Sequence, residues 1–383
     1  MGKFFISGIQ QMGIGVPEVY PACELYRNYF GVNVKIFDER AVADIMAPYM
    51  GGVERKRHAI LALNLQGGGG FEIWQHLDTP PNPSKFEILP GDLGIFCCKI
   101  KCKNVVETYN FYKNSHPHTE FPSLRAQRSN QKDTGLLHSV RNDEWISPLY
   151  KDALGNDFFY LRDPYKNIFQ LVKGDDWFMN QHKQTGGVFG AMIGTPDMEK
   201  SIDFYAKILG YDTILSDKTG IFEDFAYLKT PHNQFRRVLL THSKKREGAF
   251  SQILASSQIE LVQALDRNDI HKIFDGRMWG DMGFIQLCFD VSDMSAMEKH
   301  CQSAGYPFTI DSRKKSQKFD MGEATGDFAY NEDPSGTLIE YVETKKIPIL
   351  KKLGIYLNIK NFNPAKPIPV WILKMLRVME KKK

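Results

Sequence analysis

The sequence contains no apolar run near the roughly 18 residues that a membrane-spanning helix needs. Its first residues have neither the apolar segment nor the cleavage site of a secretory signal, so we expect a cytoplasmic protein. Cysteine is scarce, with six residues that show no zinc-like pairing with histidine and mostly lie inside apolar segments. We interpret them as buried free thiols. A Ser-His-Asp order, a nucleophile elbow and a nucleotide-binding fingerprint are also missing, which removes the commonest hydrolase and nucleotide-binding motifs.

The composition is that of a globular protein. Of 383 residues, 42% are hydrophobic and 25% are charged, and this length suits two domains. Positive charge is concentrated at the C-terminal end, where residues 345–383 contain eleven lysines and arginines and a single acid, Glu380. The rest of the chain is mildly acidic. Because it lacks an arginine-rich or aromatic-interleaved basic patch, we expect no nucleic-acid partner.

One layout recurs four times along the chain. An apolar strand with period-two alternation leads into an amphipathic helix, and further strands follow, the last of which carries a polar residue in an apolar run. The helices start at Glu18, Asn104, Asp197 and Asp293, with spacings of 86, 93 and 96 residues. A nearly constant period with the same internal order indicates duplication.

The pattern also predicts individual elements. We expect helices at 22–30, 105–112 and 198–209, and a fourth that starts at 294 and stops at Gly305. The predicted strands are 9–16, 34–37, 58–63, 71–75, 94–102, 163–172, 188–195, 258–263, 283–293 and 333–342. Gly67 to Gly70 lies between two strands with no helix after it, so we predict a hairpin turn and not a phosphate loop. We predict a loop for the polar stretch from Ser115 to Asp133. We also predict a linker between the two halves from Lys173 to Thr185.

These repeats resemble the vicinal-oxygen-chelate superfamily, which includes glyoxalase I, the extradiol dioxygenases and the bleomycin-resistance proteins. The resemblance rests on the capped helices and on the closing segments that begin Asp163-Pro-Tyr-Lys-Asn and Asp333-Pro-Ser-Gly-Thr. It implies an α+β fold of four βαβββ modules that form two open barrel-like halves, with a plan similar to 4-hydroxyphenylpyruvate dioxygenase. We expect a first domain at 7–175 (modules 7–77 and 92–175), a second at 186–343 (modules 186–264 and 282–343), and a basic amphipathic tail at 344–383.

The resemblance also implies two metal-ligand positions in each module, one on the first strand and one on the last. Carried onto this chain, they are Gln11 and Glu72, Cys97 and Gln170, Gly190 and Glu260, and Gln286 and Glu340. With modules one and two paired and modules three and four paired, the expected metal ligands are Glu260, Gln286 and Glu340 in the second-half cleft. Gly190 has no side chain to bind the metal, so water, the substrate or a histidine such as His242 would fill that coordination position.

Oxygen ligands of this kind suit a hard divalent cation, although Fe, Mn, Ni, Zn, Co and Mg cannot be told apart. We therefore expect an enzyme that acts on a small oxygenated carbon substrate by metal-assisted proton transfer, as a lyase or isomerase. Glu340 and Glu260 are the catalytic candidates, either as ligands or, for one of them, as the proton-transfer base.

Two alternatives remain open. One is a non-catalytic protein of the resistance type that binds a small molecule. The other is an Fe(II) dioxygenase with atypical ligands, since the usual two histidines are replaced by Gly190 and Gln286. The first-half cleft is expected to bind substrate, or to be a scaffold, through residues on one strand face: Gln11, Glu72, Trp74, Cys97, Lys99 and Gln170.

The basic tail ends in a segment from Pro367 to Lys383 that combines a tryptophan, large aliphatic residues and a cluster of lysines. One interpretation is a helix that packs back on the barrel or across a homo-oligomer and keeps its lysines in water. The other is an interfacial helix at an anionic membrane, which would make the protein peripheral to the membrane.

Overall fold

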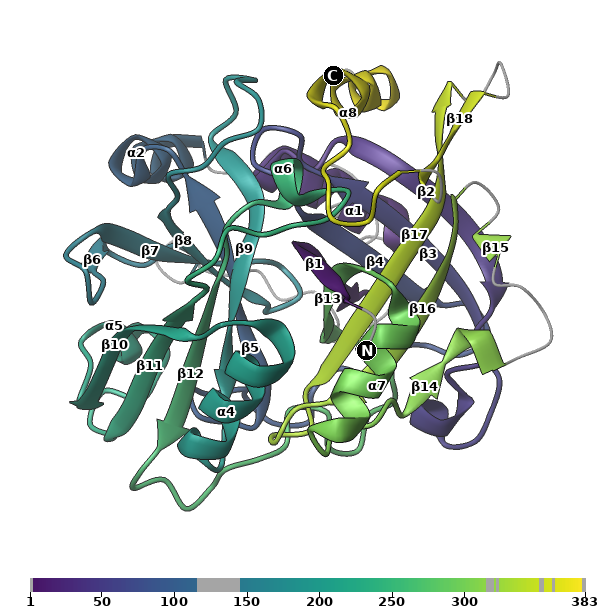
Figure 1. Ribbon diagram of the computed structural model, residues 1–383. Coiled ribbons are helices and arrows are strands. Elements are labelled where there is room, and N and C mark those ends of the chain that lie inside the picture. Colours follow the sequence, from purple (N-terminus) through teal and green to yellow (C-terminus); the bar gives the residue numbers. More distant parts are fainter. Residues whose placement is uncertain are drawn as a thin grey trace, which may run out of the picture.

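The computed structural model describes residues 3–115, 145–314, 320–321, 324–350, 355–359 and 362–380 (Figure 1). Two curled mixed sheets form two barrel-like halves, and helices lie on their outer sides, so the predicted α+β class is confirmed. Most of the predicted loop 115–133 lies outside the described residues. Residues 174–184 connect the last strand of module two to the first strand of module three, and because these two modules share one sheet, the predicted linker between halves is wrong.

The first and fourth modules build a ten-stranded sheet. Its main path runs through β14 (Ile310–Asp311), β16 (Ala324–Glu332), β17 (Leu338–Leu350), β13 (Gly283–Ser292), β1 (Phe5–Gly15), β4 (Gly70–His76), β3 (Lys56–Leu63) and β2 (Val34–Val42), while β15 (Asp320–Met321) pairs with β16 and β18 (Ile355–Asn358) with β17.

The second and third modules build an eight-stranded sheet. Its order is β10 (Thr213–Gly220), β11 (Phe235–Thr241), β12 (Gln258–Ala264), β9 (Thr185–Gly194), β5 (Gly94–Cys102), β8 (Ile168–Lys173), β7 (Asp157–Arg162) and β6 (Tyr150–Lys151).

The predicted pairing of modules is therefore wrong. First strands join antiparallel across the halves, β1 to β13 and β5 to β9, so modules one and four share one sheet and modules two and three the other. The domains expected at 7–175 and 186–343 each contribute to both sheets. The strand ladders account for this, because each first strand hydrogen-bonds to its own module's last strand on one edge and to the other first strand on its second edge.

The helices form where the sequence predicts them, as α1 (Val19–Phe30), α2 (Val105–Ser115), α4 (Met198–Leu209) and α7 (Met294–Ser303). Asn104, Asp197 and Asp293 accept a hydrogen bond from a backbone N–H of the first turn. Gly31 and Gly210 end α1 and α4 in the left-handed conformation, at φ 61° and 72°. Shorter helical segments are η1 (Ala47–Met50), α5 (Asp224–Tyr227), α6 (Ser251–Leu254), η3 (Ser312–Lys314), α8 (Val370–Met375) and η6 (Leu376–Met379).

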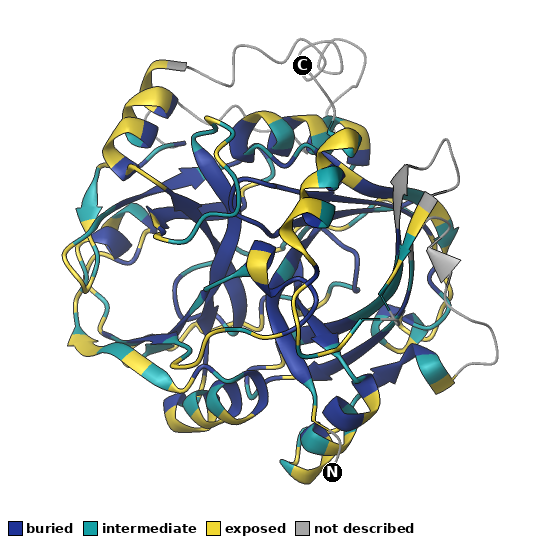
Figure 2. Cartoon of the chain, turned by 45° about the horizontal axis from the view of Figure 1, so that its top comes forward, coloured by how far each residue is buried: buried dark blue, intermediate teal, exposed yellow. Residues whose placement is uncertain are grey.

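One core joins the two sheets to the four long helices. Alternate residues of the first strands, such as Met12, Ile100, Ile193 and Leu287, point into it. Figure 2 shows these strands as buried, while the helices expose their outward sides. Five of the six cysteines are buried and Cys23 is half-buried, and all six are free thiols as predicted. The other faces of the two sheets line separate clusters, so each sheet has an inner side on which a cleft can form.

Two tyrosine hydroxyls tie the first module to the second and the third module to the fourth. Tyr26 of α1 donates to Asp163 at 2.7 Å, and Tyr205 of α4 donates to Asp333 at 2.9 Å. Each aspartate also accepts a backbone N–H group of its own turn. Tyr165 donates to Asp163 at 2.9 Å, and Ser335 donates to Asp333 at 2.8 Å. The two closing motifs singled out in the sequence are thus turn caps that hold the helix of the preceding module.

The tail packs back on the ten-stranded sheet. Ile368, Leu373 and Leu376 are buried in the cluster that lines the inner side of this sheet. Glu380 forms a bridge to Val34 at the β2 edge, and η6 also contacts β17. The predicted packing of the tail on the barrel is thus confirmed for residues 362–380. None of the helices in the described ranges is long and apolar enough to cross a membrane.

Candidate active site

Four polar side chains converge on the inner side of the ten-stranded sheet. Its four adjacent central strands contribute one each: Glu340 from β17, Gln286 from β13, Gln11 from β1 and Glu72 from β4. All four are buried, with at most 8% of their surface exposed. We call the space in front of them the outer-module cleft, because the first and last modules enclose it.

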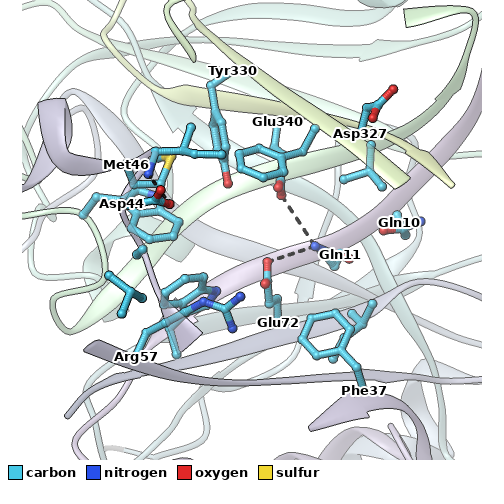
Figure 3. Close-up of a pocket in the computed structure, with 18 residues that line it drawn as sticks. Gln10, Gln11, Phe37, Asp44, Met46, Arg57, Glu72, Asp327, Tyr330 and Glu340 are labelled. Atoms are coloured by element: carbon cyan, nitrogen blue, oxygen red, sulfur yellow. Dashed lines mark hydrogen bonds between the residues drawn. The ribbon is translucent and has the colours of Figure 1, made fainter. Parts of the chain in front are cut away.

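The two amides and the two carboxylates are in direct contact. The Nε2 atom of Gln11 donates to Glu72 at 3.0 Å and to Glu340 at 3.5 Å, as the dashed lines in Figure 3 show. The Nε2 atom of Gln286 reaches the same two carboxylates at 3.2 and 3.3 Å. Trp279 fixes the other end of this amide, since its indole N–H donates to Gln286 Oε1 at 3.1 Å.

Burial disfavours the charged form of both carboxylates. Burial and the nearby charge of Glu72 raise the pKa of Glu340 to about 8. Burial also raises the pKa of Glu72, although the positive charge of Arg57 opposes the shift. Two buried like charges that share hydrogen-bond donors favour either a shared proton or a cation.

The four side chains carry oxygen atoms of the kind that a hard divalent cation prefers. The Oε1 atom of Gln11 is buried and has no hydrogen-bond partner among the described residues. The Nε2 atoms of Gln11 and Gln286 now face the carboxylates, so a cation placed there would require both amides to make a half-turn, and the turn of Gln286 would break its hydrogen bond from Trp279. No group of three or more His, Cys, Asp or Glu side chains that could hold a metal occurs in the described part of the chain. A metal centre there would therefore have to use amide oxygens.

A small apolar cavity of about 60 Å³ lies against these carboxylates. Its apolar lining includes Phe37, Ile45, Met46, Trp74, Phe328 and Val342. Arg57 is the cation of the lining, and Figure 3 shows its guanidinium turned toward Glu72. It stacks on Trp74 and donates from Nη2 to Glu39 at 2.8 Å. Its Nη1 atom is buried and has no hydrogen-bond partner among the described residues.

The segment after β2 covers the cleft. Ala43, Asp44, Ile45 and Met46 line the cavity from this side. Tyr49, at the end of the segment, reaches across to the fourth module and donates to Glu332 at 2.6 Å. Its hydroxyl also lies 2.7 Å from the Thr309 hydroxyl. The segment thus spans the two modules that enclose the cleft.

The second and third modules enclose a larger space of about 390 Å³, the inner-module cleft. Here a lysine occupies the place between the ligand positions. Lys99 Nζ lies 2.6 Å from Gln170 Oε1 and 2.6 Å from Glu260 Oε2. Arg237 pairs with the other oxygen of Glu260 at 2.7 Å and with Asp224 at 2.8 Å. The positive charge that a metal would bring is already supplied by these two side chains.

The other two ligand positions of this cleft supply no charged ligand. A Cβ atom on Gly190 would lie 1.8 Å from the backbone oxygen of Gln258, so this position in β9 accepts only glycine. Burial raises the pKa of the Cys97 thiol far above its ordinary value, which keeps the thiol protonated. Burial would raise the pKa of Glu260, but Arg237 and Lys99 outweigh it and lower this pKa to about 2.

The structure regroups the predicted site residues. The expected grouping of Glu260 with Gln286 and Glu340 is wrong, because Glu260 lies in the other sheet. Gln11, Glu72 and Trp74 join Gln286 and Glu340 in the outer-module cleft, whereas Cys97, Lys99 and Gln170 join Glu260. His242 contacts the backbone oxygen of Lys244 and lines neither cleft.

Sequence reasoning missed Arg57, Trp279 and Arg237. For Arg57 a signal exists, since it shares the period-two face of Leu61, and Leu61 stands opposite Glu72 in the ladder. A charged residue on the inner face of an apolar strand marks a cleft or a buried ion pair. Trp279 lies in the connection before β13, where strand periodicity gives no information.

Comparison with known proteins places this geometry in context. Residues 188–341 match the sequence profile of the Glyoxalase/Bleomycin resistance protein/Dioxygenase superfamily. The structure is similar to a putative dioxygenase from Bacillus subtilis, with a TM-score of 0.50, 12% identity, and coverage of 88% of this chain and 86% of that chain. It is also similar to glyoxalase I from Zea mays, with a TM-score of 0.47, 14% identity, and coverage of 88% and 92%. No curated protein matches the chain in sequence. At 12% identity the likeness to the Bacillus subtilis protein shows the fold alone.

Proposed function

We propose that the chain is a metal-dependent enzyme of the Glyoxalase/Bleomycin resistance protein/Dioxygenase superfamily, with its reaction centre in the outer-module cleft. Gln11, Glu72, Gln286 and Glu340 would hold one divalent cation. The observation that carries the proposal is their convergence from four adjacent strands, with two buried carboxylates and a buried amide oxygen that lacks a partner. In such a site, a bound cation polarises a substrate oxygen and stabilises negative charge that develops on it.

The residues around the cation position define the substrate that fits. The cavity of about 60 Å³ admits a small molecule, and its apolar lining excludes water from the reacting carbon. Arg57 would donate from Nη1 to an oxygen of the substrate that carries negative charge. One of the two carboxylates would accept a proton from the carbon beside the polarised oxygen. We therefore favour proton transfer on a small oxygenated carbon compound, as in a lyase or isomerase.

A non-catalytic binding protein is the second candidate. The observation that favours it is that the amide N–H groups of Gln11 and Gln286 already satisfy both carboxylates without a metal. The same cleft would then bind a small polar molecule through Arg57. An iron dioxygenase of the two-histidine type is not favoured, because no histidine is among the four converging side chains.

Metal analysis of the full chain separates the two candidates. The protein is purified without chelator, and separate samples are supplemented with Mn, Fe, Co, Ni, Zn or Mg salts. We expect one metal ion per chain, which is lost from the double variant Glu72→Gln with Glu340→Gln. Cys97→Ala, which removes the counterpart of Gln11 in the inner-module cleft, serves as the matched control and retains the metal. A folded wild-type chain that binds none of these ions would reject the enzyme proposal and leave the binding protein.

A further inference from the structure

The tail carries an outward face of mixed aromatic and basic character. Along α8 and η6, the side chains of Val370, Trp371, Lys374, Arg377 and Val378 are exposed. Trp371 exposes 66% of its surface and Val378 exposes 64%, the largest values among the exposed large hydrophobic residues. The spacing of these positions by three, four and seven residues puts them on one side of the helical segment. We call them the tail face.

The inward side of the same segment holds this face in place. Leu373 and Leu376 are buried against the ten-stranded sheet, and Ile368 is fixed before the helix by a backbone hydrogen bond to Ala249 at 2.9 Å. The tail face is therefore presented outward by a packed helix and needs no rearrangement to meet a partner. Figure 1 shows α8 at the top of the molecule, at the end opposite α4.

Positive charge dominates the segment. Between residues 362 and 380 the acid is Glu380, which contacts Gln181 and Lys183 on the inner side and also lies 3.6 Å from Arg377 Nε. Lys366 is exposed before the helix, and Lys374 and Arg377 lie on the face itself. In the sequence, Lys381, Lys382 and Lys383 follow directly.

We propose that the tail face docks on the surface of an anionic lipid bilayer. Tryptophan is the side chain most suited to the boundary between headgroups and acyl chains, since its ring is apolar and its N–H is polar. The two valines add apolar surface beside it, and lysine and arginine side chains next to it meet lipid phosphates while their stems stay in the interface. Each basic residue near such a surface strengthens partitioning by roughly fivefold.

A second copy of the chain fits this face less well. In a two-fold symmetric contact the same patch meets itself, so Lys374 and Arg377 would face the same cations of the partner. The exposed tryptophan would then be buried at the cost of like-charge repulsion. A bilayer with negatively charged lipids provides apolar depth and opposite charge together, which is why we commit to it as the occupant.

The experiment is co-sedimentation of the full chain with two kinds of vesicle, phosphatidylcholine alone and phosphatidylcholine mixed with phosphatidylserine. Point variants are preferable to truncation, because deletion of the tail would uncover Leu373 and Leu376. One variant combines Lys374→Glu with Arg377→Glu, and another is Trp371→Ala. The matched control combines Lys200→Glu with Lys207→Glu on α4, whose side chains are 72% and 62% exposed.

We expect the wild-type chain and the α4 control to pellet with the anionic vesicles and to be released by salt. Charge reversal in the tail face should weaken binding by roughly 25-fold or more, and Trp371→Ala should weaken it several-fold on both kinds of vesicle. Binding of the tail variants at the wild-type level would overturn the proposal. So would a wild-type chain that stays in the supernatant with the anionic vesicles, and dimerisation through Trp371 in light scattering would then identify a second copy as the occupant.

Discussion

Glu72 and Glu340 come from opposite ends of the chain, yet they accept hydrogen bonds from the same two amide side chains, those of Gln11 and Gln286. This arrangement depends on the antiparallel pairing of β1 with β13, which brings the first module against the fourth. The site thus exists only when the two ends of the chain meet. Its stability and the stability of the ten-stranded sheet are linked.

The first prediction follows from this linkage. Addition of the divalent ion that binds best should raise the free energy of unfolding of the wild-type chain, by about 2.7 kcal/mol at a concentration one hundred times the dissociation constant. Glu340→Gln should reduce this gain strongly, because one charged ligand is lost. Thermal unfolding with and without chelator measures the effect. Equal shifts in the wild type and in Glu340→Gln would show that the ion binds elsewhere, and Cys97→Ala is the control that should keep the full shift.

The sequence predicted the modules far better than their arrangement. The family resemblance placed Gln11, Glu72, Gln286 and Glu340 on inner strand faces, and period-two alternation supported this for Gln286, since the face of a residue depends only on its neighbours in the strand. Which of the first strands pair with each other depends on hydrogen bonds between the backbone groups at the strand edges. These groups are the same for nearly every residue type, so the sequence does not specify the pairing. Neighbouring modules pair in many folds, and that expectation failed here because β1 joins β13. The misplacement of Glu260 in the metal group follows from this one error.

Substitution by alanine should change the stability of the chain differently at two glycines that lie on equivalent strands. In Gly190→Ala the new Cβ would lie 1.8 Å from the Gln258 backbone oxygen, so the β9–β12 ladder must shift. We expect a loss of about 1–3 kcal/mol or more in the free energy of unfolding. In Gly13→Ala the new Cβ meets the Gln286 amide at 2.6 Å, and a side-chain end can move.

Gly13→Ala should therefore cost less stability but weaken binding of a divalent ion in the outer-module cleft. Urea unfolding gives the stability of both variants, and metal titration gives the affinity. The opposite ranking of the two variants in urea would contradict the backbone clash at Gly190. Unchanged metal affinity in Gly13→Ala would mean that Gln286 is not a ligand.

The packed side of the tail supports a third prediction. Leu373 is fully buried in the cluster that also contains Val34 and Ile347 of the ten-stranded sheet. Leu373→Ala should lower the free energy of unfolding by about 2–5 kcal/mol, since it removes buried contacts and leaves a cavity. Val378→Ala, at a position that is 64% exposed, is the matched control and should change stability by less than about 0.5 kcal/mol. If Leu373→Ala is as stable as this control, the tail does not pack on the sheet in solution.

The buried ion pairs of the inner-module cleft predict a dependence of stability on pH. Arg237 and Lys99 lower the pKa of Glu260 to about 2 against the effect of burial, from an ordinary value near 4.5. A carboxyl group whose pKa is lower in the folded chain stabilises the fold above its unfolded pKa, and this contribution is lost as the pH falls toward the folded value. The window for Glu260 therefore extends from about pH 4.5 down to about pH 2.

Glu260→Gln leaves Lys99 and Arg237 buried without this counter-charge, although Asp224 still pairs with Arg237. At pH 7 we expect it to destabilise the chain by about 3–5 kcal/mol relative to the wild type. This difference should shrink by about 1.4 kcal/mol for each pH unit within the window, because the wild type gradually loses the same charge. Urea unfolding of both proteins at a series of pH values measures it. Glu223→Gln, a change at an exposed position that lines the same cleft, should show no such trend, and a pH-independent difference for Glu260→Gln would mean that its carboxylate is not held by the two cations.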